Sequence, residues 1–360
     1  MKIHADRDDI PDGLKHCMML FPFWGSTVGH NGYDTFIEEA AKAWQLVDLA
    51  EADFAVLPFD GCHLLRLHEP NERRRAFIAR ARAVVVRAAV KGRRTVVVVN
   101  SDSSEPVPLP PTAIVLRTSL NRRLRRANEF ALPAWHEDIV RTHFGAEPLL
   151  RDFREVPKVS FCGMAAKGGP PVKRRIKRQL AKCLDTVGWH VPDNDGVYLR
   201  FEAMRQLSAC HDLETAFVVR DRYFGGAIEN AEVRKTVRRE YIDSIVESDY
   251  VLCVRGYGNF SFRFFEALSL GRTPLVIDTD CVFPYDFLHD YRDLCIVVPM
   301  RELSRIGEYV RAFHDRFHAE SYLHHQRRLR EFWETWLSPE GFFGNVSLHW
   351  SGTAGVGQGT

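Results

Sequence analysis

The residues best suited to chemistry lie in one short stretch near position 260. Arg255 and Arg263 follow an apolar run, and Glu266 comes one helical turn after the second arginine. Guanidinium groups bind phosphate oxygens through paired hydrogen bonds, and a carboxylate can accept hydrogen bonds from two neighbouring sugar hydroxyls. These residue types therefore predict a site for a phosphorylated ligand that carries a ribose.

The elements around these residues form a strand, a glycine turn, a helix and a second strand. Residues 250–254 are apolar and β-branched, residues 260–270 have a helical pattern that ends at Gly271, and residues 273–277 are apolar again. Ligands of such sheets bind beyond the carboxyl ends of the strands, where backbone N–H groups and a helix dipole favour phosphate. The predicted ligand contacts here are Arg255, Gly256, Asn259, Ser261, Arg263 and Glu266. The alternative for Arg263 and Glu266 is an ordinary surface pair on one helix face.

Two further loops follow predicted strands in the same half of the chain. Arg220 and Arg222 end the strand expected at 216–220 and are predicted to line the same site. The glycine loop at 163–169 precedes a basic helix expected at 172–184. That loop could contact phosphate or acceptor, or it could be a hairpin beside a solvated basic helix.

Asp278-Thr279-Asp280 has the D-x-D pattern that holds a divalent metal in some enzymes. Here the pattern follows a buried strand, and arginines already supply positive charge for phosphate. We therefore predict no metal and no bound cofactor, and we expect Thr279 or Asp280 to lie near the sugar end of the ligand.

Carboxylates that could remove a proton lie in loops that follow predicted strands in the first half of the chain. The base candidates are Asp102 and Asp34, and residues 60–63 form a third such loop. The alternatives are a helix cap for Asp34 and an Asx turn for Asp102. The basic segment 117–126 could contact an anionic acceptor, or it could be a solvated face.

Composition is typical of a globular protein with two domains. The chain has 360 residues, 45% of them hydrophobic, and its net charge of +2 gives no global field that would favour nucleic acid. It has no apolar run long enough to span a membrane, and its polar residues 1–9 do not resemble a signal peptide. The eight cysteines are scattered without a C-x-x-C pair. We therefore predict reduced, structural thiols and a cytoplasmic protein.

Alternating strand and helix patterns predict two doubly wound α/β domains. Strands are expected at 18–23, 54–57, 95–99, 113–116, 159–162, 216–220, 250–254 and 273–277. Helices are expected at 33–47, 69–91, 172–184, 230–247, 260–270, 303–318 and 321–337. The predicted divisions are an acceptor-binding domain at 1–150, a nucleotide-binding domain at 151–305, returning helices at 306–345 and a flexible tail at 346–360.

The segment around position 260 resembles the C-terminal half of exostosin-type glycosyltransferases. The matching residues are Arg255-Gly256, Ser261, Arg263, Phe265-Glu266-Ala267-Leu268, Gly271 and Pro274-Leu275-Val276. Weaker similarity extends upstream to residues 51–58 and 158–163. The match covers about fifty residues densely, and the chain looks closest to compact relatives without a membrane anchor.

The resemblance implies a GT-B architecture, in which two domains face a cleft and a C-terminal helix returns to the first domain. Phe332, Trp333 and Trp336 are the residues expected to pack there. It also implies inverting, metal-independent transfer of a hexosyl or glycuronosyl group from a nucleotide sugar, with UDP expected, during cell-surface polysaccharide assembly. The acceptor would be a glycan or a lipid-linked oligosaccharide, and no nucleic-acid partner is expected.

Two alternatives to a transferase stay open. One is a nucleotide-sugar epimerase with the same architecture. The other is a non-catalytic glycan- or nucleic-acid-binding protein on a transferase scaffold, which the basic segment 117–126 would suit. The sequence leaves the oligomeric state and any peripheral membrane attachment undecided.

Overall fold

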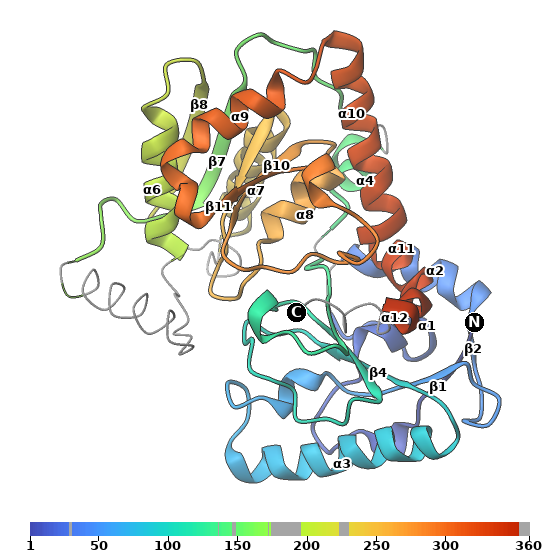
Figure 1. Ribbon diagram of the computed structural model, residues 1–360. Coiled ribbons are helices and arrows are strands. Elements are labelled where there is room, and N and C mark those ends of the chain that lie inside the picture. The colour runs from blue at the N-terminus through green and yellow to red at the C-terminus, as the bar shows by residue number, and fades with distance from the viewer. Residues whose placement is uncertain are drawn as a thin grey trace.

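The computed structural model describes residues 1–28, 31–135, 137–145, 149–171, 173, 196–222 and 230–352. The helix expected at 172–184, the loop after Arg222 and the last residues of the tail lie outside these ranges. Figure 1 shows two halves, each with a central set of strands flanked by helices.

The first half contains a parallel sheet of six strands in the order β2-β1-β3-β4-β5-β6. Its strands are β1 (Lys2–His4), β2 (Gln45–Leu46), β3 (Phe54–Val56), β4 (Thr95–Val99), β5 (Ala113–Arg117) and β6 (Glu129–Ala131). Its helices are α1 (Phe21–Trp24), α2 (Asp34–Ala43) and α3 (Asn71–Val90). The strand order reverses at β1, as in doubly wound folds.

The second half contains a parallel sheet of five strands in the order β11-β10-β9-β7-β8. Its strands are β7 (Lys158–Met164), β8 (Glu214–Arg220), β9 (Tyr250–Cys253), β10 (Thr273–Asp278) and β11 (Ile296–Pro299). Its helices are α4 (Ile139–Phe144), α6 (Gly196–Ser208), α7 (Ala231–Val246), α8 (Phe262–Ser269), α9 (Ile306–His314) and α10 (Ala319–Phe332). The strand order reverses at β7, between its neighbours β8 and β9. The two parallel sheets confirm the α/β class.

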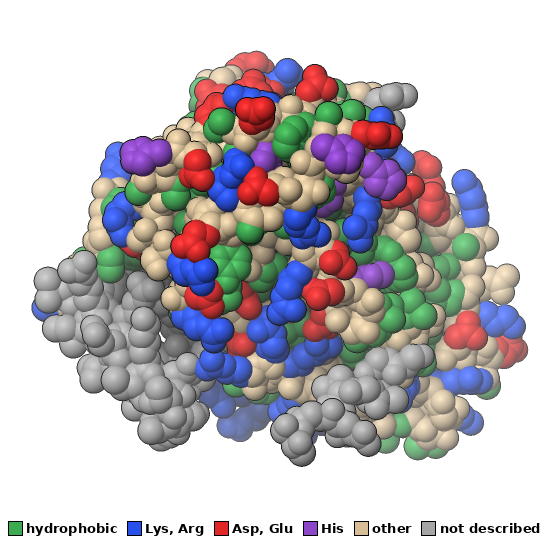
Figure 2. Space-filling view, turned by 45° about the horizontal axis from the view of Figure 1, so that its top comes forward, with side chains coloured by type: hydrophobic (Ala, Val, Ile, Leu, Met, Phe, Trp, Pro, Cys, Tyr) green, Lys and Arg blue, Asp and Glu red, His purple; other side chains and the backbone are tan. Residues whose placement is uncertain are grey.

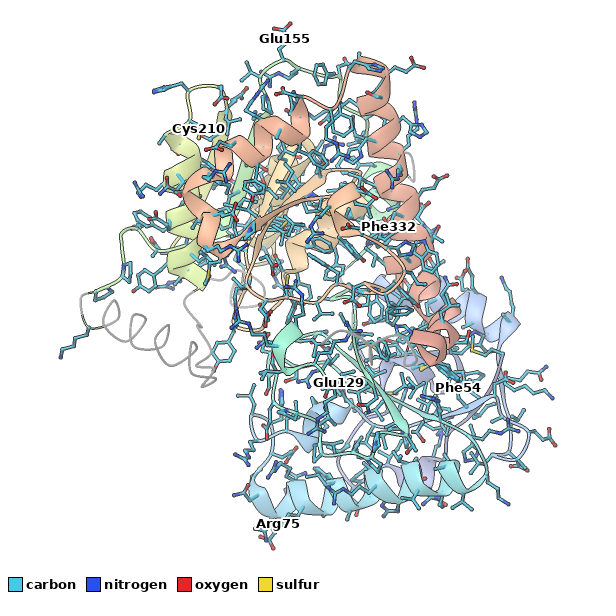
Figure 3. The ribbon with its side chains drawn as sticks, viewed as in Figure 1. Phe54, Arg75, Glu129, Glu155, Cys210 and Phe332 are labelled. Carbon is cyan, nitrogen blue, oxygen red and sulfur yellow. The ribbon has the colours of Figure 1, made fainter. Side chains whose placement is uncertain are left out.

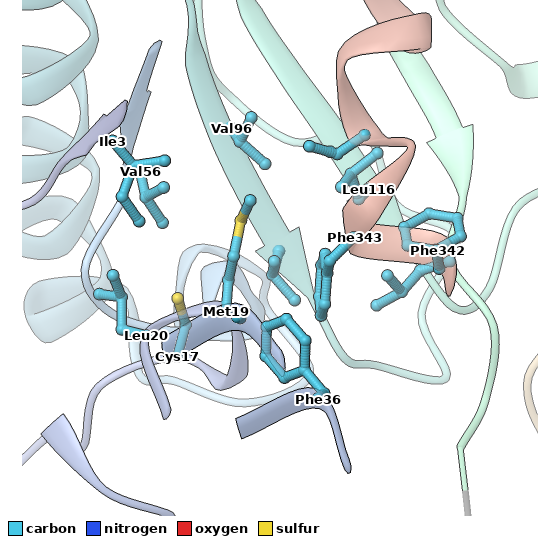
Figure 4. Packing of buried hydrophobic residues seen from close by; sticks show 14 of the residues in the cluster. Ile3, Cys17, Met19, Leu20, Phe36, Val56, Val96, Leu116, Phe342 and Phe343 are labelled. Carbon is cyan, nitrogen blue, oxygen red and sulfur yellow. The ribbon is translucent and has the colours of Figure 1, made fainter. Parts of the chain in front are cut away.

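The central strand β4 explains why its sequence reads as an unbroken apolar run. Val96 and Val98 pack on one face against the core that includes Phe36 of α2 (Figure 4). Val97 and Val99 pack on the other face against α3. Because helices cover both faces, every position of β4 is buried, as is typical of parallel sheets.

The strand expected at residues 18–23 is wrong. Met18–Leu20 form a 3-10 turn, and Phe21–Trp24 form α1 with Pro22 in its first turn. Proline has no N–H for a central strand ladder but fits the first turn of a helix. The first strand is instead β1, whose three residues include one buried side chain, Ile3. Such a short strand gives no periodic signal.

The C-terminal helices are divided between the two halves. Ile306, Val310 and Phe313 of α9 pack on the second sheet, and α10 packs on its opposite face. Phe342 and Phe343 of α11 (Pro339–Gly344) pack in the first-half core (Figure 4). The residues expected to make this return behave differently, because Phe332 and Trp333 lie in the second-half core and Trp336 touches both cores.

The structure can be compared with the predictions about membrane spans and thiols only within the described residues. Among them, no helix is long and apolar enough to cross a bilayer. The seven cysteines in this part of the chain are free thiols, and most of them are buried. Burial raises the pKa of the Cys253 thiol to about 12, which is consistent with a packing role.

Two histidines are buried where the C-terminal helices pack. His325 of α10 contacts the Thr273 hydroxyl at 3.0 Å, and the His349 ring contacts the carbonyl of Val346 at 2.9 Å. Burial lowers the pKa of His325 to about 3 and that of His349 to about 4. Both imidazoles therefore stay neutral in the folded protein at pH values where they are charged in the unfolded chain.

Acid should destabilise the protein through these two rings. Their folded pKa values lie below the unfolded value of about 6.5, so the unfolded chain binds more protons as the pH falls below that value. Between pH 7 and about pH 5 each ring should cost about 2 kcal/mol of unfolding free energy. Urea titrations at several pH values measure this loss, and His349→Gln should remove its own share. If the unfolding free energy of His349→Gln falls with pH as steeply as that of the unmodified protein, the role of His349 would be contradicted.

Candidate functional site

The carboxyl ends of the two sheets face each other across one boundary. The loops after β4 and β5 (residues 100–105 and 118–121) contact the turn at 255–261, which follows β9. The second of these loops also contacts the loop that follows β10, through Asn121 and Cys281. Figure 1 shows these ends meeting between the two halves. Ligands of doubly wound sheets bind at such ends.

A pocket lies at this boundary beside the turn at 255–261. Thr118 and Leu132 of the first half close it, and its other walls belong to the second half. The second-half walls include the predicted residues Arg255, Asn259, Ser261 and Thr279. The space between the walls is about 470 Å³ with its open mouth included.

Asn259 is the centre of the contact between the halves. It is buried, and its backbone N–H donates to the Ser119 hydroxyl at 2.9 Å. Its side-chain amide donates to Asn121 and accepts a 2.7 Å hydrogen bond from Thr279. These bonds correct the predicted roles, because neither the Asn259 N–H nor the Thr279 hydroxyl is open to a ligand here.

Asp102 reaches across the same boundary. Its Oδ1 accepts a 3.2 Å hydrogen bond from the backbone N–H of Gly258. A Cβ at position 258 would lie 2.6 Å from that oxygen and 2.5 Å from Phe260, so only glycine fits. Of the two base candidates, Asp102 is therefore the one that the fold brings to the turn.

The D-x-D residues contact the basic segment rather than open space. Arg122 donates to Asp278 at 3.2 Å, and the Arg123 N–H donates to Asp280 at 3.1 Å. Arg125 pairs with Asp286 at 2.6 Å. The side chains of Arg122 and Arg125 thus bind acidic residues of the same chain, and the contact of this segment with an anionic acceptor stays a prediction. We call these pairs, together with the contacts of Gly258 and Asn259, the interdomain seam.

Arg117 is buried, which the basic segment did not suggest. Its guanidinium pairs with Glu129 at 3.3 Å and donates to the carbonyls of Ser103, Glu105 and Ser119 at 2.6–2.9 Å. Burial lowers the pKa of Arg117. One side chain thus fixes both first-half loops that carry the seam, including the loop of Asp102.

The pairing of β7 and β9 stops before their carboxyl ends, and we call the gap between these ends, which the side chains of Arg263 and Arg200 occupy, the crevice. The two strands pair only at Val159–Tyr250 and Ser160–Val251. Beyond these pairs, Arg263 of α8 donates to the carbonyl of Cys162 at 2.7 Å. A Cβ at position 163 would lie 2.8 Å from that guanidinium, and Gly163 also has a φ of 153°. The glycine near the end of β7 therefore admits the arginine.

Arg200 of α6 fills the same crevice from the other face of the sheet. It donates to the carbonyls of Met164 and Arg255 at 2.8 and 2.9 Å. A Cβ at Gly196, the first residue of α6, would lie 2.5 Å from the Arg255 carbonyl. Sequence reasoning missed α6 and Arg200, and the amphipathic pattern of residues 196–208 was the available signal.

Arg263 is a cation without a counterion in the described part of the chain. It makes no ion pair with a described carboxylate, its Nε has no hydrogen-bond partner, and its guanidinium lies 4.3 Å over the Phe161 ring. The surface pair with Glu266 is therefore wrong. At the start of α8, Ser261 makes no capping hydrogen bond, so the first N–H groups of this helix lack that partner.

Glu266 is nearly buried and faces α7. It accepts a 2.9 Å hydrogen bond from Arg238 and another from the Tyr241 hydroxyl. Arg238 also pairs with Glu137 at 2.8 Å. In this arrangement Glu266 joins α8 to α7, and the predicted ribose contact would compete with these bonds.

The remaining predicted residues lie farther from the seam. Arg220 pairs with Glu240 of α7 and approaches the Cys162 thiol, which places it near the β7 end. Arg222 is exposed at the last described positions of its loop. Asp34 is exposed at the start of α2, and its neighbour Thr35 accepts a hydrogen bond from Arg141.

Asp60 is a third carboxylate at the first-half edge that the predictions did not select. It follows β3 and accepts hydrogen bonds from the N–H groups of Cys62 and Asn100 at 2.8 and 3.1 Å. Burial raises the pKa of Asp60 against these bonds. Its position directly after a strand and before Gly61 was the available signal.

In the described part of the chain, no group of three or more His, Cys, Asp and Glu side chains is arranged to hold a metal. No protein-family model matches the chain, and no curated protein matches it significantly. The resemblance to exostosin-type enzymes therefore stays a prediction from motif residues.

Replacing Asn259 should weaken the contacts between the two halves more than the packing within each half. Asn259→Ala leaves Thr279 and Asn121 without their buried partner and should lower the unfolding free energy by about 1–3 kcal/mol. Amide hydrogen exchange around Ser119 should also become faster. Asn345→Ala is the matched control, because Asn345 also donates two side-chain bonds but lies away from the seam. Equal exchange in both variants would contradict the role of Asn259.

Proposed function

We propose that the protein is a GT-B-type glycosyltransferase that uses a nucleotide sugar, with UDP as the expected nucleotide. The donor diphosphate would lie at the crevice between β7 and β9, and a glycan hydroxyl would approach from the first half. This is the switch point of the second sheet, where doubly wound domains bind nucleotides.

The observation that carries this proposal is the charge of Arg263. A partly buried guanidinium without a carboxylate partner is costly, and proteins keep such groups where a ligand supplies the missing charge. Arg255 lines the adjoining pocket, and the uncapped start of α8 adds backbone donors. All three features favour an anion with several oxygens, as in a diphosphate.

Asp102 is the proposed base. It is exposed, and one of its oxygens is positioned by the Gly258 N–H. In the transfer, the acceptor oxygen would attack the anomeric carbon while the bond from that carbon to the diphosphate breaks. The acceptor proton would move to the Asp102 carboxylate, and the leaving diphosphate would be stabilised by Arg255 and Arg263. One such displacement inverts the anomeric carbon.

Nucleotide binding is the first test of the proposal. Thermal unfolding should be measured with UDP, GDP, CMP and their sugar conjugates, with and without EDTA. A ligand at 100 times its Kd should add about 2.7 kcal/mol of stability. We expect a shift with UDP compounds that survives EDTA, and no shift with any nucleotide would overturn the proposal.

Arg263→Met should weaken nucleotide binding at least about ten-fold, because a hydrogen bond to a charged group contributes about 1.5–3 kcal/mol. Arg263→Lys keeps the charge without the paired donors and should be intermediate. Titration calorimetry gives the affinities, and urea titration separates them from loss of fold. Arg292→Met, at a side chain 81% exposed and away from the crevice, is the control.

The same panel distinguishes the two alternative functions. Product formed from a nucleotide sugar without any acceptor would identify an epimerase. Stabilisation by glycans but by no nucleotide would identify a non-catalytic binding protein.

A further inference from the structure

The helix α3 has an outer face that the proposed function does not use. Its inner face buries Phe77, Ala81, Val84, Val85 and Ala88 against the first sheet. Figure 1 shows α3 along the edge of the first half, on the side away from the second half. Its outermost positions, called here the outer stripe, are Arg75, Ala79, Arg82, Val86 and Val90, which lie on one helix face by their spacing.

The outer face of α3 is strongly basic. The helix contains six arginines and one acidic residue, Glu72, and Lys91, Arg93 and Arg94 follow it directly. The whole chain has a net charge of only +2. On the face shown in Figure 2, by contrast, acidic and basic side chains are interspersed. From Asn71 to Arg94, basic side chains therefore outnumber acidic ones nine to one.

Neighbouring carboxylates neutralise arginines on the flanks of the helix but not on its outer stripe. Asp9 pairs with Arg80 and Arg87, and glutamates pair with Arg73 and Arg74. Arg75 and Arg82 of the outer stripe make no ion pair with a carboxylate in the described ranges, and Arg82 donates only to the Pro108 carbonyl. Figure 3 shows Arg75 pointing away from the body of the protein.

Apolar side chains accompany this charge. Val86 is 52% exposed and Val90 is 79% exposed, one helical turn apart. An α-helix with a basic, partly apolar outer face binds membrane surfaces, because valines enter the headgroup region while arginines meet lipid phosphates. Nucleic acid is a poorer match, since the outer stripe has no aromatic or amide side chain to contact bases and its valines would gain nothing from a phosphate backbone.

We propose that the outer stripe of α3 docks on a membrane surface that contains anionic lipids. Charge complementarity selects the lipid, and the two valines provide the apolar insertion. The helix would lie flat, along a length of about 30 Å for its 20 residues. Because α3 covers a face of the first sheet and the candidate site lies at the carboxyl ends of its strands, docking would leave the site free to meet an acceptor.

Vesicle co-sedimentation of the full chain tests this proposal. Phosphatidylcholine vesicles with phosphatidylglycerol should bind the protein, and vesicles of phosphatidylcholine alone should bind it weakly. Added salt should weaken the binding through screening. Because each basic side chain strengthens binding about five-fold, Arg75→Glu with Arg82→Glu should weaken it at least about 25-fold. Val86→Asp with Val90→Asp should also release the protein.

Matched surface variants control for general effects. Val233→Asp changes a valine that is 47% exposed on α7, and Arg292→Glu changes an exposed arginine of the second half. Both should bind vesicles like the unmodified protein, and unfolding midpoints confirm that every variant is folded. If a stripe variant fails to fold, Val86→Ser with Val90→Ser replaces it. Vesicle binding that the stripe variants leave unchanged would overturn the proposal, as would binding to a nucleic-acid duplex but not to anionic vesicles.

Discussion

The carboxyl ends of parallel strands set the main constraint on this structure. Carbonyl groups that leave the ladder there still need donors when they are buried. In this protein arginines supply many of them: Arg117 binds three carbonyls of the first-half loops, and Arg200 and Arg263 bind the ends of β7 and β9. Arginine suits this task because it has five donors and no acceptor. Loop positions at both sheet edges thus depend on guanidinium groups.

This solution also leaves positive charge where ligands of doubly wound sheets bind. A neutral donor could satisfy the Cys162 carbonyl, but Arg263 brings a charge that its backbone contacts do not neutralise. A structural role and an anion-binding role are therefore compatible in one side chain. Arg117 and Arg263 differ in this respect. The charge of Arg117 is neutralised by its buried partner Glu129, whereas no described carboxylate neutralises the charge of Arg263.

The sequence predicted the elements whose signal is local. The β-branched run of β4, the long α3 and the β9-α8-β10 unit lie where their patterns indicate. It failed where tertiary partners decide: Arg117 reads as a surface charge until β6 brings Glu129 beside it, and Glu266 reads as a free carboxylate until α7 covers it. The candidate site was predicted as a region, but the pairing of Asn259 with Ser119 and Asn121 across the boundary depends on how the two halves meet.

The turn at 255–261 has two sides, and the two sides have different uses. On one side Gly258 and Asn259 donate their N–H groups to Asp102 and Ser119, which closes the seam. On the other side lie the start of α8 and the crevice that Gly163 leaves open for Arg263. A ligand on the seam side would have to break buried hydrogen bonds, and any buried donor or acceptor that it left without a partner would cost free energy. A diphosphate on the crevice side would leave the seam intact and keep Asp102 in place beside the turn. The two close approaches, at Gly258 and at Gly163, thus favour a site built with the halves already in contact.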